Sequence, residues 1–532
     1  MMNRIVRAIL AAAVTVATLV LLTPTADAVP SYTRRYGLEC SSCHTMWGSL
    51  NAAGVTFRLS GYRAMFGRDL VPISPDIDVG AGVFAIPTTL PLSFITGAGG
   101  DWRTEKRAPS DGTVFRRTAS SLNVEDASIF LTGPIGKHFS VFAEFPMFES
   151  KGWEFTPTGP SEANDHTQVR QFQFESESPA FEVAKFWFNN LLGEALLPRD
   201  SFNALVGITH LPLAYPSGKV RLSVNQYLVY ERRALDLISP LMPSSFLVGD
   251  SNDKLFRLSE PQALAEINGM IVPGGSPTDT SKRETFWLEY HLGMSNGSAV
   301  LADNNNAKDA YGRLVGRYYG QSLGVFAYFS PDTYDDTLRR GAALNQSCHS
   351  PLGGLEFPFP QNINCQFDAS GVVLMDVPNG IMNPANPYGK NSEVKLAVDG
   401  TLSLVPFNVP FALENQFMWS RESNPTLFGA NFTWIGGFHQ LNWYIAKEAV
   451  AYARFDWIQG KEFNDVPFGG ITDTKPREWD VVAGVQYLVY QNVKLTGEFR
   501  HHVFEDQAVH PSDLRRARLT DDGGTVRVML GF

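Results

Sequence analysis

Apolar and polar residues alternate with a period of two along many short segments of the chain. In residues 493–504 the odd positions are mainly apolar, beginning with Val493, and the even positions from Lys494 to His502 are polar. Residues 393–404 and 479–487 repeat this pattern. The alternation predicts β-strands with one apolar and one polar face, and a length of about ten residues is what a tilted strand needs to cross a bilayer.

The connections between these segments alternate in length. Short connections are expected at 320–321, 405–408, 447–448 and 489–492, and long ones at 331–392, 421–426, 459–477 and 505–522. The final strand alternates up to Phe532, which resembles the C-terminal strand of bacterial outer-membrane barrels. Together these features predict an all-β fold, a transmembrane antiparallel barrel of about 16 to 18 strands. Its first strand is expected near Ile77 or near Leu122, and residues 233–283 are expected to be mostly loop with one weak strand.

The first 28 residues have the pattern of a secretion signal. Arg4 and Arg7 precede an uncharged apolar stretch, and residues 26–28 read Ala-Asp-Ala, a small-x-small cleavage site. A membrane-anchoring helix is the alternative, but the apolar stretch is short for a span. Export would place the mature chain in an oxidising compartment.

Composition narrows the function classes. The net charge is −10, which argues against a nucleic-acid-binding protein because such a protein needs a basic face to neutralise phosphates. Charged residues make up 18% of the chain and aromatic residues 12%. This balance suits many strands with aromatic girdles rather than a soluble domain, where about 25% of residues are charged.

One short motif indicates a redox cofactor. Residues 40–44 read Cys-Ser-Ser-Cys-His, the attachment pattern of a c-type haem. Cys40 and Cys43 on one turn can each form a thioether to a vinyl group of the porphyrin, and His44 can then ligate the iron. Two alternatives share the Cys-x-x-Cys spacing. A redox pair would be expected within a βαβ pattern, and a zinc site would need two further ligands nearby.

Residues 29–75 form the predicted haem segment. A short helix is expected after His44, with Leu50, Gly54 and Phe57 on one face. Met65 is the first candidate for the distal iron ligand because it lies far enough along the chain to return to the opposite haem face. A histidine of the barrel, such as His138 or His439, is an alternative. The segment is too short for a self-sufficient core and is expected to plug the barrel lumen.

The other two cysteines, Cys348 and Cys365, fall in the longest predicted loop. In an oxidising compartment, a disulfide between them is the expected arrangement. The pair Cys348-His349 lacks the upstream cysteine of a second haem motif because position 345 is Asn345.

Residues 30–62 resemble the start of the fused outer-membrane cytochrome–porins, the monohaem family best known from iron-oxidising bacteria. The matching residues are Pro30-Ser31-Tyr32, Arg34, Gly37, Cys40 to His44, Thr45, Leu50-Asn51, Gly54, Phe57, Leu59 and Gly61-Tyr62. The resemblance implies one covalent haem c in a small segment that plugs a barrel of about 16 strands. It also implies electron passage from extracellular Fe(II), or a similar donor, to periplasmic cytochromes.

The expected organisation is therefore a signal peptide (1–28), a c-type haem segment (29–75) and an outer-membrane β-barrel (76–532). The haem segment is expected on the periplasmic or lumen side. An electron-transfer oxidoreductase of the iron:cytochrome type is the most that the sequence suggests, since no bond-making group accompanies the haem motif. Two alternatives stay open, an outer-membrane solute porin with a haem-bearing gate or sensor segment and a soluble periplasmic cytochrome.

Overall fold

The structure is a computed structural model of the whole chain. It describes residues 31–66, 68–80, 84–108, 115–149, 183–193, 196–217, 221–238, 257–272, 286–297, 307–333, 365–367, 373–375, 390–423, 425, 431–463, 475–506 and 518–532. Within these ranges, 16 antiparallel strands close into one barrel. The barrel strands are β7 (Leu92–Ala108), β8 (Phe115–Pro134), β9 (Phe139–Glu149), β10 (Val183–Phe188), β11 (Asn203–Thr209), β12 (Gln262–Ile271), β13 (Trp287–Ser295), β14 (Asp309–Tyr318), β15 (Gln321–Ser330), β18 (Glu393–Ser403), β19 (Phe411–Glu422), β20 (Phe432–Ala446), β21 (Ala449–Gly460), β22 (Pro476–Tyr490), β23 (Val493–Asp506) and β24 (Arg518–Gly531).

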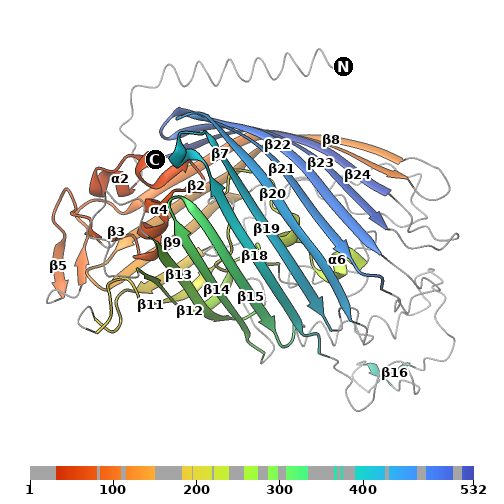
Figure 1. Cartoon of the computed structure of the whole chain (residues 1–532), viewed down its shortest axis with the longest axis horizontal. Coiled ribbons are helices and arrows are strands. Elements are labelled where there is room, and N and C mark those ends of the chain that lie inside the picture. Colours follow the sequence, from red (N-terminus) through yellow and green to blue (C-terminus); the bar gives the residue numbers. More distant parts are fainter. Residues whose placement is uncertain are drawn as a thin grey trace.

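The barrel closes where its last strand pairs with its first. Strand β24 is hydrogen-bonded to both β23 and β7, so no strand of the barrel leaves an unpaired edge. Closure matters because an open edge would expose backbone N–H and C=O groups to lipid, where nothing can satisfy them. Figure 1 shows the strands running at a common tilt, with both the C-terminus and α2 at the same end of the barrel.

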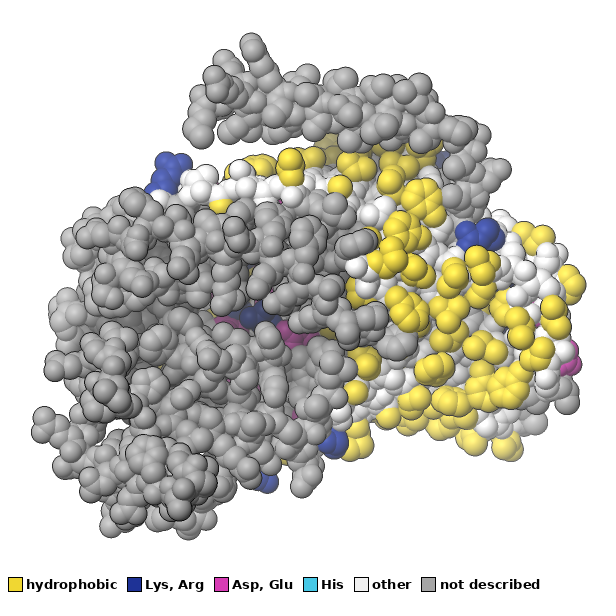
Figure 2. All heavy atoms as spheres, turned by 180° about the vertical axis from the view of Figure 1, so that it is seen from behind, with side chains coloured by type: hydrophobic (Ala, Val, Ile, Leu, Met, Phe, Trp, Pro, Cys, Tyr) yellow, Lys and Arg dark blue, Asp and Glu magenta, His cyan; other side chains and the backbone are white. Residues whose placement is uncertain are grey.

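The barrel is apolar outside and polar inside. On β18, Leu396 and Val398 are each 48% exposed, whereas Lys395 and Asp399 on the opposite face are buried. Hydrophobic side chains dominate the part of the barrel wall that Figure 2 exposes. A protein dissolved in water would bury the apolar face and expose the polar one, so this arrangement requires a lipid environment around the wall. The alternative of a soluble cytochrome is therefore wrong.

From β14 onward, connections at the two ends of the barrel differ in length, as the sequence predicted, whereas the β10–β11 and β12–β13 connections are long and lie at the same end as the short turns. Strands β14 and β15 join through Tyr319-Gly320, and β20–β21 and β22–β23 also join through two residues each. We call this end the short-turn mouth and the opposite end the long-loop mouth. The η4 turn (Val405–Phe407) lies at the short-turn mouth, and the hairpin of β16 (Cys365–Phe367) and β17 (Val373–Met375) follows β15 in the chain. Within the described part of the chain, no helix is long and apolar enough to cross a membrane.

Two sequence expectations about the barrel need adjustment. Its first strand begins at Leu92, between the two starting points near Ile77 and Leu122. Residues 77–86 do form strands, β5 (Ile77–Gly80) and β6 (Phe84–Ile86), but these pair only with each other. Alternation identifies a strand without identifying its partner, which explains the difference. Residues 233–283 were expected to be mostly loop with one weak strand, but they contain β12, a ten-residue barrel strand that is paired on both sides. Residues 239–256 and 273–283 lie outside the described residues, so the expectation of loop there stays a prediction.

An N-terminal segment, residues 31–66 and 68–76, lies across the short-turn mouth (Figure 1). Its elements are α2 (Ser31–Tyr36), α3 (Cys40–Cys43), β1 (His44–Met46), β2 (Ser49–Leu50), α4 (Ala52–Leu59), β3 (Ala64–Met65) and β4 (Arg68–Asp69). Aromatic side chains anchor it to the lumen wall. Tyr62 stacks on Phe142 of β9, with 5.8 Å between the ring centroids, and meets Trp187 of β10 edge-on at 5.3 Å. The predicted helix after His44 is confirmed as α4.

A second segment fills the lumen from inside. We call it the lumen segment, residues 210–217 and 221–238, which follows β11 in the chain. It contains the short helices α5 (Leu228–Glu231) and α6 (Ala234–Ile238). Its side chains Leu211, Tyr227 and Tyr230 are fully buried and share one apolar core with Phe57 of the N-terminal segment. The sequence expected the N-terminal segment alone to fill the lumen.

Candidate functional site: the haem-attachment turn and the filled lumen

The Cys-Ser-Ser-Cys-His sequence forms a single helical turn followed by an extended residue. Cys40 and Cys43 are the first and last residues of α3, and His44 caps the turn by donating its backbone N–H to Cys40 O. Both thiols are free. The backbone therefore places the two thiols on one turn with the imidazole directly after them, which is the arrangement that covalent attachment of a c-type haem requires.

Asn51 and Gly54 lock this turn against α4. The Asn51 side chain accepts the Gly54 N–H at 3.0 Å, which caps α4, and donates to Ser41 O and Ser42 O at 3.2 Å each. A Cβ added at Gly54 would lie 2.1 Å from Cys43 O, so only glycine allows the helix and the turn to approach this closely. The structural role of Asn51 and Gly54 is to hold the turn in one conformation.

The His44 side chain has the properties of a neutral ligand. Burial lowers its pKa to about 4, with the nearby Lys494 charge as a further cause. Its Nδ1 is buried, and it has no hydrogen-bond partner among the described atoms. Burial also raises the pKa of the Cys43 thiol to about 11 and raises that of Cys40. Two unpaired thiols and a neutral imidazole with a buried unsatisfied nitrogen fit the attachment of a haem at this turn.

The turn is held inside the short-turn mouth by the residues that follow it. Met46 is almost fully buried and packs with Leu222 of the lumen segment and Val450 of β21. Lys494 Nζ lies 3.4 Å from Trp47 O and 5.4 Å from the centre of the Trp47 ring. The motif is therefore fixed to the wall on one side and to the lumen segment on the other.

The remaining residues singled out in the sequence have mixed outcomes. Met65 lies in β3 and packs against the same apolar core as Cys43, and its distal-ligand role stays a prediction. His138 Nδ1 lies near Asn189 O, and Nδ1 of the exposed His439 ring lies 2.8 Å from the Asn415 side chain; a distal-ligand role for either stays a prediction. The Cys348–Cys365 disulfide lies outside the described residues, because Cys348 and the Cys365 side chain are not described. Among the described His, Cys, Asp and Glu residues, no group of three or more could hold a metal ion.

A buried carboxylate on β23 holds residues 223–225 of the lumen segment. Glu498 accepts hydrogen bonds from the Ser223 hydroxyl at 2.7 Å and from the backbone N–H groups of Val224 and Asn225 at 2.8 and 2.9 Å. The Asn225 amide and the Tyr452 hydroxyl donate to the same carboxylate. Charge-assisted bonds of this kind are about twice as strong as neutral ones.

The middle of the lumen segment stacks against β20 and β21. Arg454 donates to Asn225 O at 2.8 Å, and its guanidinium lies 4.5 Å from the centre of the Tyr227 ring. The opposite face of Tyr227 stacks on Phe438 with a centroid distance of 3.9 Å. Tyr230 donates to the Gln416 amide oxygen of β19. An aromatic residue held between a cation and another ring contributes strongly to packing in the absence of water.

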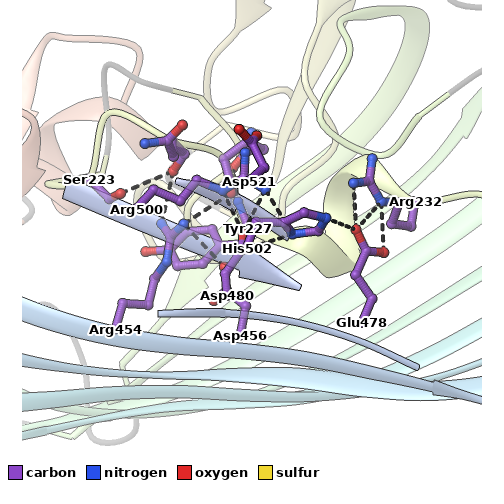
Figure 3. Close-up of polar contacts among 12 residues, drawn as sticks. Ser223, Tyr227, Arg232, Arg454, Asp456, Glu478, Asp480, Arg500, His502 and Asp521 are labelled. Atoms are coloured by element: carbon purple, nitrogen blue, oxygen red, sulfur yellow. Dashed lines mark hydrogen bonds and ion pairs between the residues drawn. The ribbon is translucent and has the colours of Figure 1, made fainter. Parts of the chain in front are cut away.

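An ion-pair network anchors the end of the lumen segment (Figure 3). Arg232 binds both carboxylate oxygens of Glu478 through its Nε, at 2.9 and 2.8 Å. His502 lies 3.2 Å from Glu478 and 2.5 Å from Asp480, and the Arg500 Nε donates to Asp480 at 2.9 Å. These groups lie on neighbouring strands β22 and β23. The network joins the lumen segment to the barrel wall through charges that are largely hidden from water.

Sequence reasoning missed the lumen segment. Of the wall residues that hold it, Glu498 and its neighbours were assigned correctly to the polar face of residues 493–504, but that face alone does not reveal what the side chains contact. One signal in the sequence is the density of large apolar and aromatic residues after β11, including Leu211, Leu213, Tyr215, Tyr227 and Tyr230. An exposed outer loop would rarely carry so many.

No family model and no curated protein matches this chain. Solved structures do match. They include the outer-membrane channel DcaP of Acinetobacter baumannii (7% identity, 83% of this chain and 96% of that one, TM-score 0.42) and an anion-selective porin from Comamonas acidovorans (9%, 83% and 100%, 0.42). OprB of Pseudomonas putida matches with 9% identity over 83% of this chain and 94% of that one, with a TM-score of 0.41.

Closure, inside-out burial and the two unequal ends define the class to which the chain belongs. It is a porin-like transmembrane β-barrel of the outer-membrane type. Two features distinguish it from an open pore. An N-terminal segment with a Cys-x-x-Cys-His turn lies in one mouth, and an internal segment fills the lumen.

Proposed function

We propose that this barrel carries electrons across the bacterial outer membrane through one covalent haem c attached to Cys40 and Cys43. His44 would ligate the iron. One observation carries this proposal, namely that a Cys-x-x-Cys-His turn is held in one conformation within the mouth of a filled barrel. When bound, a c-type haem supplies a one-electron redox centre.

The residues of the chain serve such a cofactor by fixing its attachment points. Asn51 and Gly54 keep the two thiols and the imidazole in register. Burial keeps His44 neutral and able to donate a lone pair. Met46 and Trp47 tie the turn to the wall, so the attachment point does not move away from the lumen. Met65 is retained as the candidate distal ligand.

Because the lumen is filled, transport of electrons through this barrel is favoured over transport of solutes. A solute needs a continuous water-filled path, and the lumen segment contacts strands β19 to β23 through buried groups. Electrons need no such path. Extracellular Fe(II) or a similar donor would supply electrons at the long-loop mouth, and periplasmic cytochromes would accept them at the short-turn mouth.

A stopped-flow experiment tests the redox role. The detergent-purified protein, produced in cells that attach c-type haem, is mixed with Fe(II), and the absorbance of reduced haem is followed. We expect rapid reduction in the wild type and none in His44→Ala, while Ser42→Ala, which changes only a variable position of the motif, behaves as wild type. A haem that stays oxidised with Fe(II) but is reduced by another donor would remove iron and keep electron transfer.

A solute porin is the second candidate. The porin-like barrel and its polar lumen favour it, and the N-terminal segment would then act as a gate or sensor. Conductance in planar bilayers separates the two functions. The electron-transfer proposal predicts a conductance at least about tenfold below that of an open 16-strand porin, because large open barrels conduct through a water-filled lumen. An ion-selective conductance equal to that of the open porin would favour the solute porin.

A further inference from the structure

The hairpin formed by β5 and β6 carries an apolar face that is largely exposed and contacts the barrel wall through Phe84. Ile77 and Ile86 are directly paired and are 57% and 52% exposed. Val79 and Phe84 lie on the same face at a spacing of two residues and are 56% and 44% exposed. An isolated two-stranded hairpin is marginally stable in water, so a hairpin that leaves this face in water would be a poor structure.

The hairpin is held firmly at the rim of the short-turn mouth. Arg35 of α2 forms an ion pair with Asp76 at 2.5 Å, and Arg35 O accepts the Ile73 N–H at 2.7 Å. The Thr88 hydroxyl donates to Pro75 O at 3.0 Å, which ties the two ends of the hairpin together. The hairpin is thereby fixed to α2, and α2 is fixed to the wall because the Ser31 hydroxyl lies 3.0 Å from the Thr132 hydroxyl of β8.

The apolar face of the hairpin is continuous with the outer surface of the barrel. Phe84 stacks on Phe139 with 4.9 Å between the ring centroids, and Phe139 meets Phe188 edge-on at 5.4 Å. Phe139 and Phe188 point outward, because their neighbours Ser140 and Trp187 contact the N-terminal segment inside. Aromatic rings on the outer surface near the end of a transmembrane barrel form the girdle that lies at the membrane interface.

We propose that the β5–β6 hairpin is a membrane-interface anchor, with Ile77, Val79, Phe84 and Ile86 inserted among the phospholipids of the leaflet at the short-turn mouth. Charge favours lipid over a docked redox protein as the occupant. Residues 70–91 contain two charged side chains, Asp76 and Asp78, and Asp76 is neutralised by Arg35. Docking of a soluble carrier relies on complementary charge to steer the encounter. The anchor would hold the N-terminal segment, and the Cys-x-x-Cys-His turn within it, at a fixed distance from the membrane surface.

Fluorescence quenching tests this assignment without any need for haem. An environment-sensitive fluorescent amino acid replaces Val79 in the full chain, which is then reconstituted in phosphatidylethanolamine–phosphatidylglycerol vesicles. The matched control carries the same probe at Ala85, on the opposite face of the hairpin. Nitroxide on the upper acyl chain should quench the Val79 probe at least about threefold more than the Ala85 probe, and aqueous iodide should do the reverse.

A second variant separates insertion from folding. In Ile77→Ser/Ile86→Ser, the Val79 probe should lose its quenching by nitroxide lipid about threefold, while the barrel keeps its heat-dependent mobility in detergent gels. Equal quenching of both probes by iodide, in a chain that folds normally, would overturn the anchor and leave the face to a protein partner.

Discussion

Replacing Glu498 by alanine should release residues 223–225 of the lumen segment. The carboxylate accepts hydrogen bonds from Ser223, Val224 and Asn225 of the segment and from Tyr452 of the wall. Its removal leaves two backbone N–H groups, those of Val224 and Asn225, without an acceptor. Each unsatisfied group costs about 1–3 kcal/mol, so these two groups alone should destabilise the closed arrangement by about 2–6 kcal/mol.

The consequence is measurable as channel opening. A loss of about 4 kcal/mol lowers the equilibrium constant for the closed segment about 700-fold, since about 1.4 kcal/mol corresponds to a factor of ten. In planar bilayers, wild-type barrels should be nearly silent, whereas Glu498→Ala should show repeated openings. Protease added to the same sample should cleave near residues 221–226 of the variant only.

Two matched variants control this experiment. Tyr452→Phe removes the wall donor and leaves every bond between Glu498 and the lumen segment, so it should stay as silent as the wild type. Glu498→Gln keeps one carbonyl acceptor and should open at an intermediate frequency. The reasoning fails if Glu498→Ala folds normally and remains closed, or if the wild type already conducts like an open porin.

Three further predictions concern the motif, the network and the wall. Gly54→Ala places a Cβ 2.1 Å from Cys43 O and should cut the yield of covalently attached haem severalfold, as judged by haem staining, with Ala53→Gly as a tolerated control. Arg232→Ala leaves Glu478 buried without its bidentate partner, which should cost about 3–5 kcal/mol and raise hydrogen exchange in α5 and α6; unchanged exchange would contradict the anchoring role. Val398→Arg at the centre of a lipid-facing strand should lower the free energy of unfolding in lipid by about 2–4 kcal/mol, whereas Val398→Leu should leave it nearly unchanged.

The barrel could be predicted from the sequence because lipid and lumen impose opposite demands on alternate residues. Strands β18 and β23 have the faces that their alternation indicated, with Lys395 and Glu498 buried inside and Leu396 and Phe499 exposed outside. The unequal connection lengths then set the two ends. These signals are local to each strand and its turns, which is why a single sequence reveals them.

The lumen segment and the start of the barrel could not be predicted in the same way. Tyr227 and Arg232 lie in an irregular segment, whose contacts to distant strands leave no periodic trace in the sequence. Ile77 alternates like a barrel residue, but its strand pairs with β6 rather than with the wall. Register and partner choice depend on long-range pairing, which local patterns do not encode.

The Cys-x-x-Cys-His turn could be predicted only in part. The spacing of Cys40, Cys43 and His44 can be read directly from the sequence. Only the structure shows that Asn51 and Gly54 hold this turn against α4. The distal ligand has no such signature, because Met65 is related to the motif only through a shared apolar core.

The most direct test of the account is the mass and absorption spectrum of the purified full-length protein from cells that attach c-type haem. We predict one haem per chain, covalently retained after denaturation, with the Soret band of a c-type cytochrome. The Cys40→Ala/Cys43→Ala variant should lack both signals. A wild-type chain whose mass shows no added haem, in cells that load a control cytochrome, would contradict the central claim and leave a porin-like barrel.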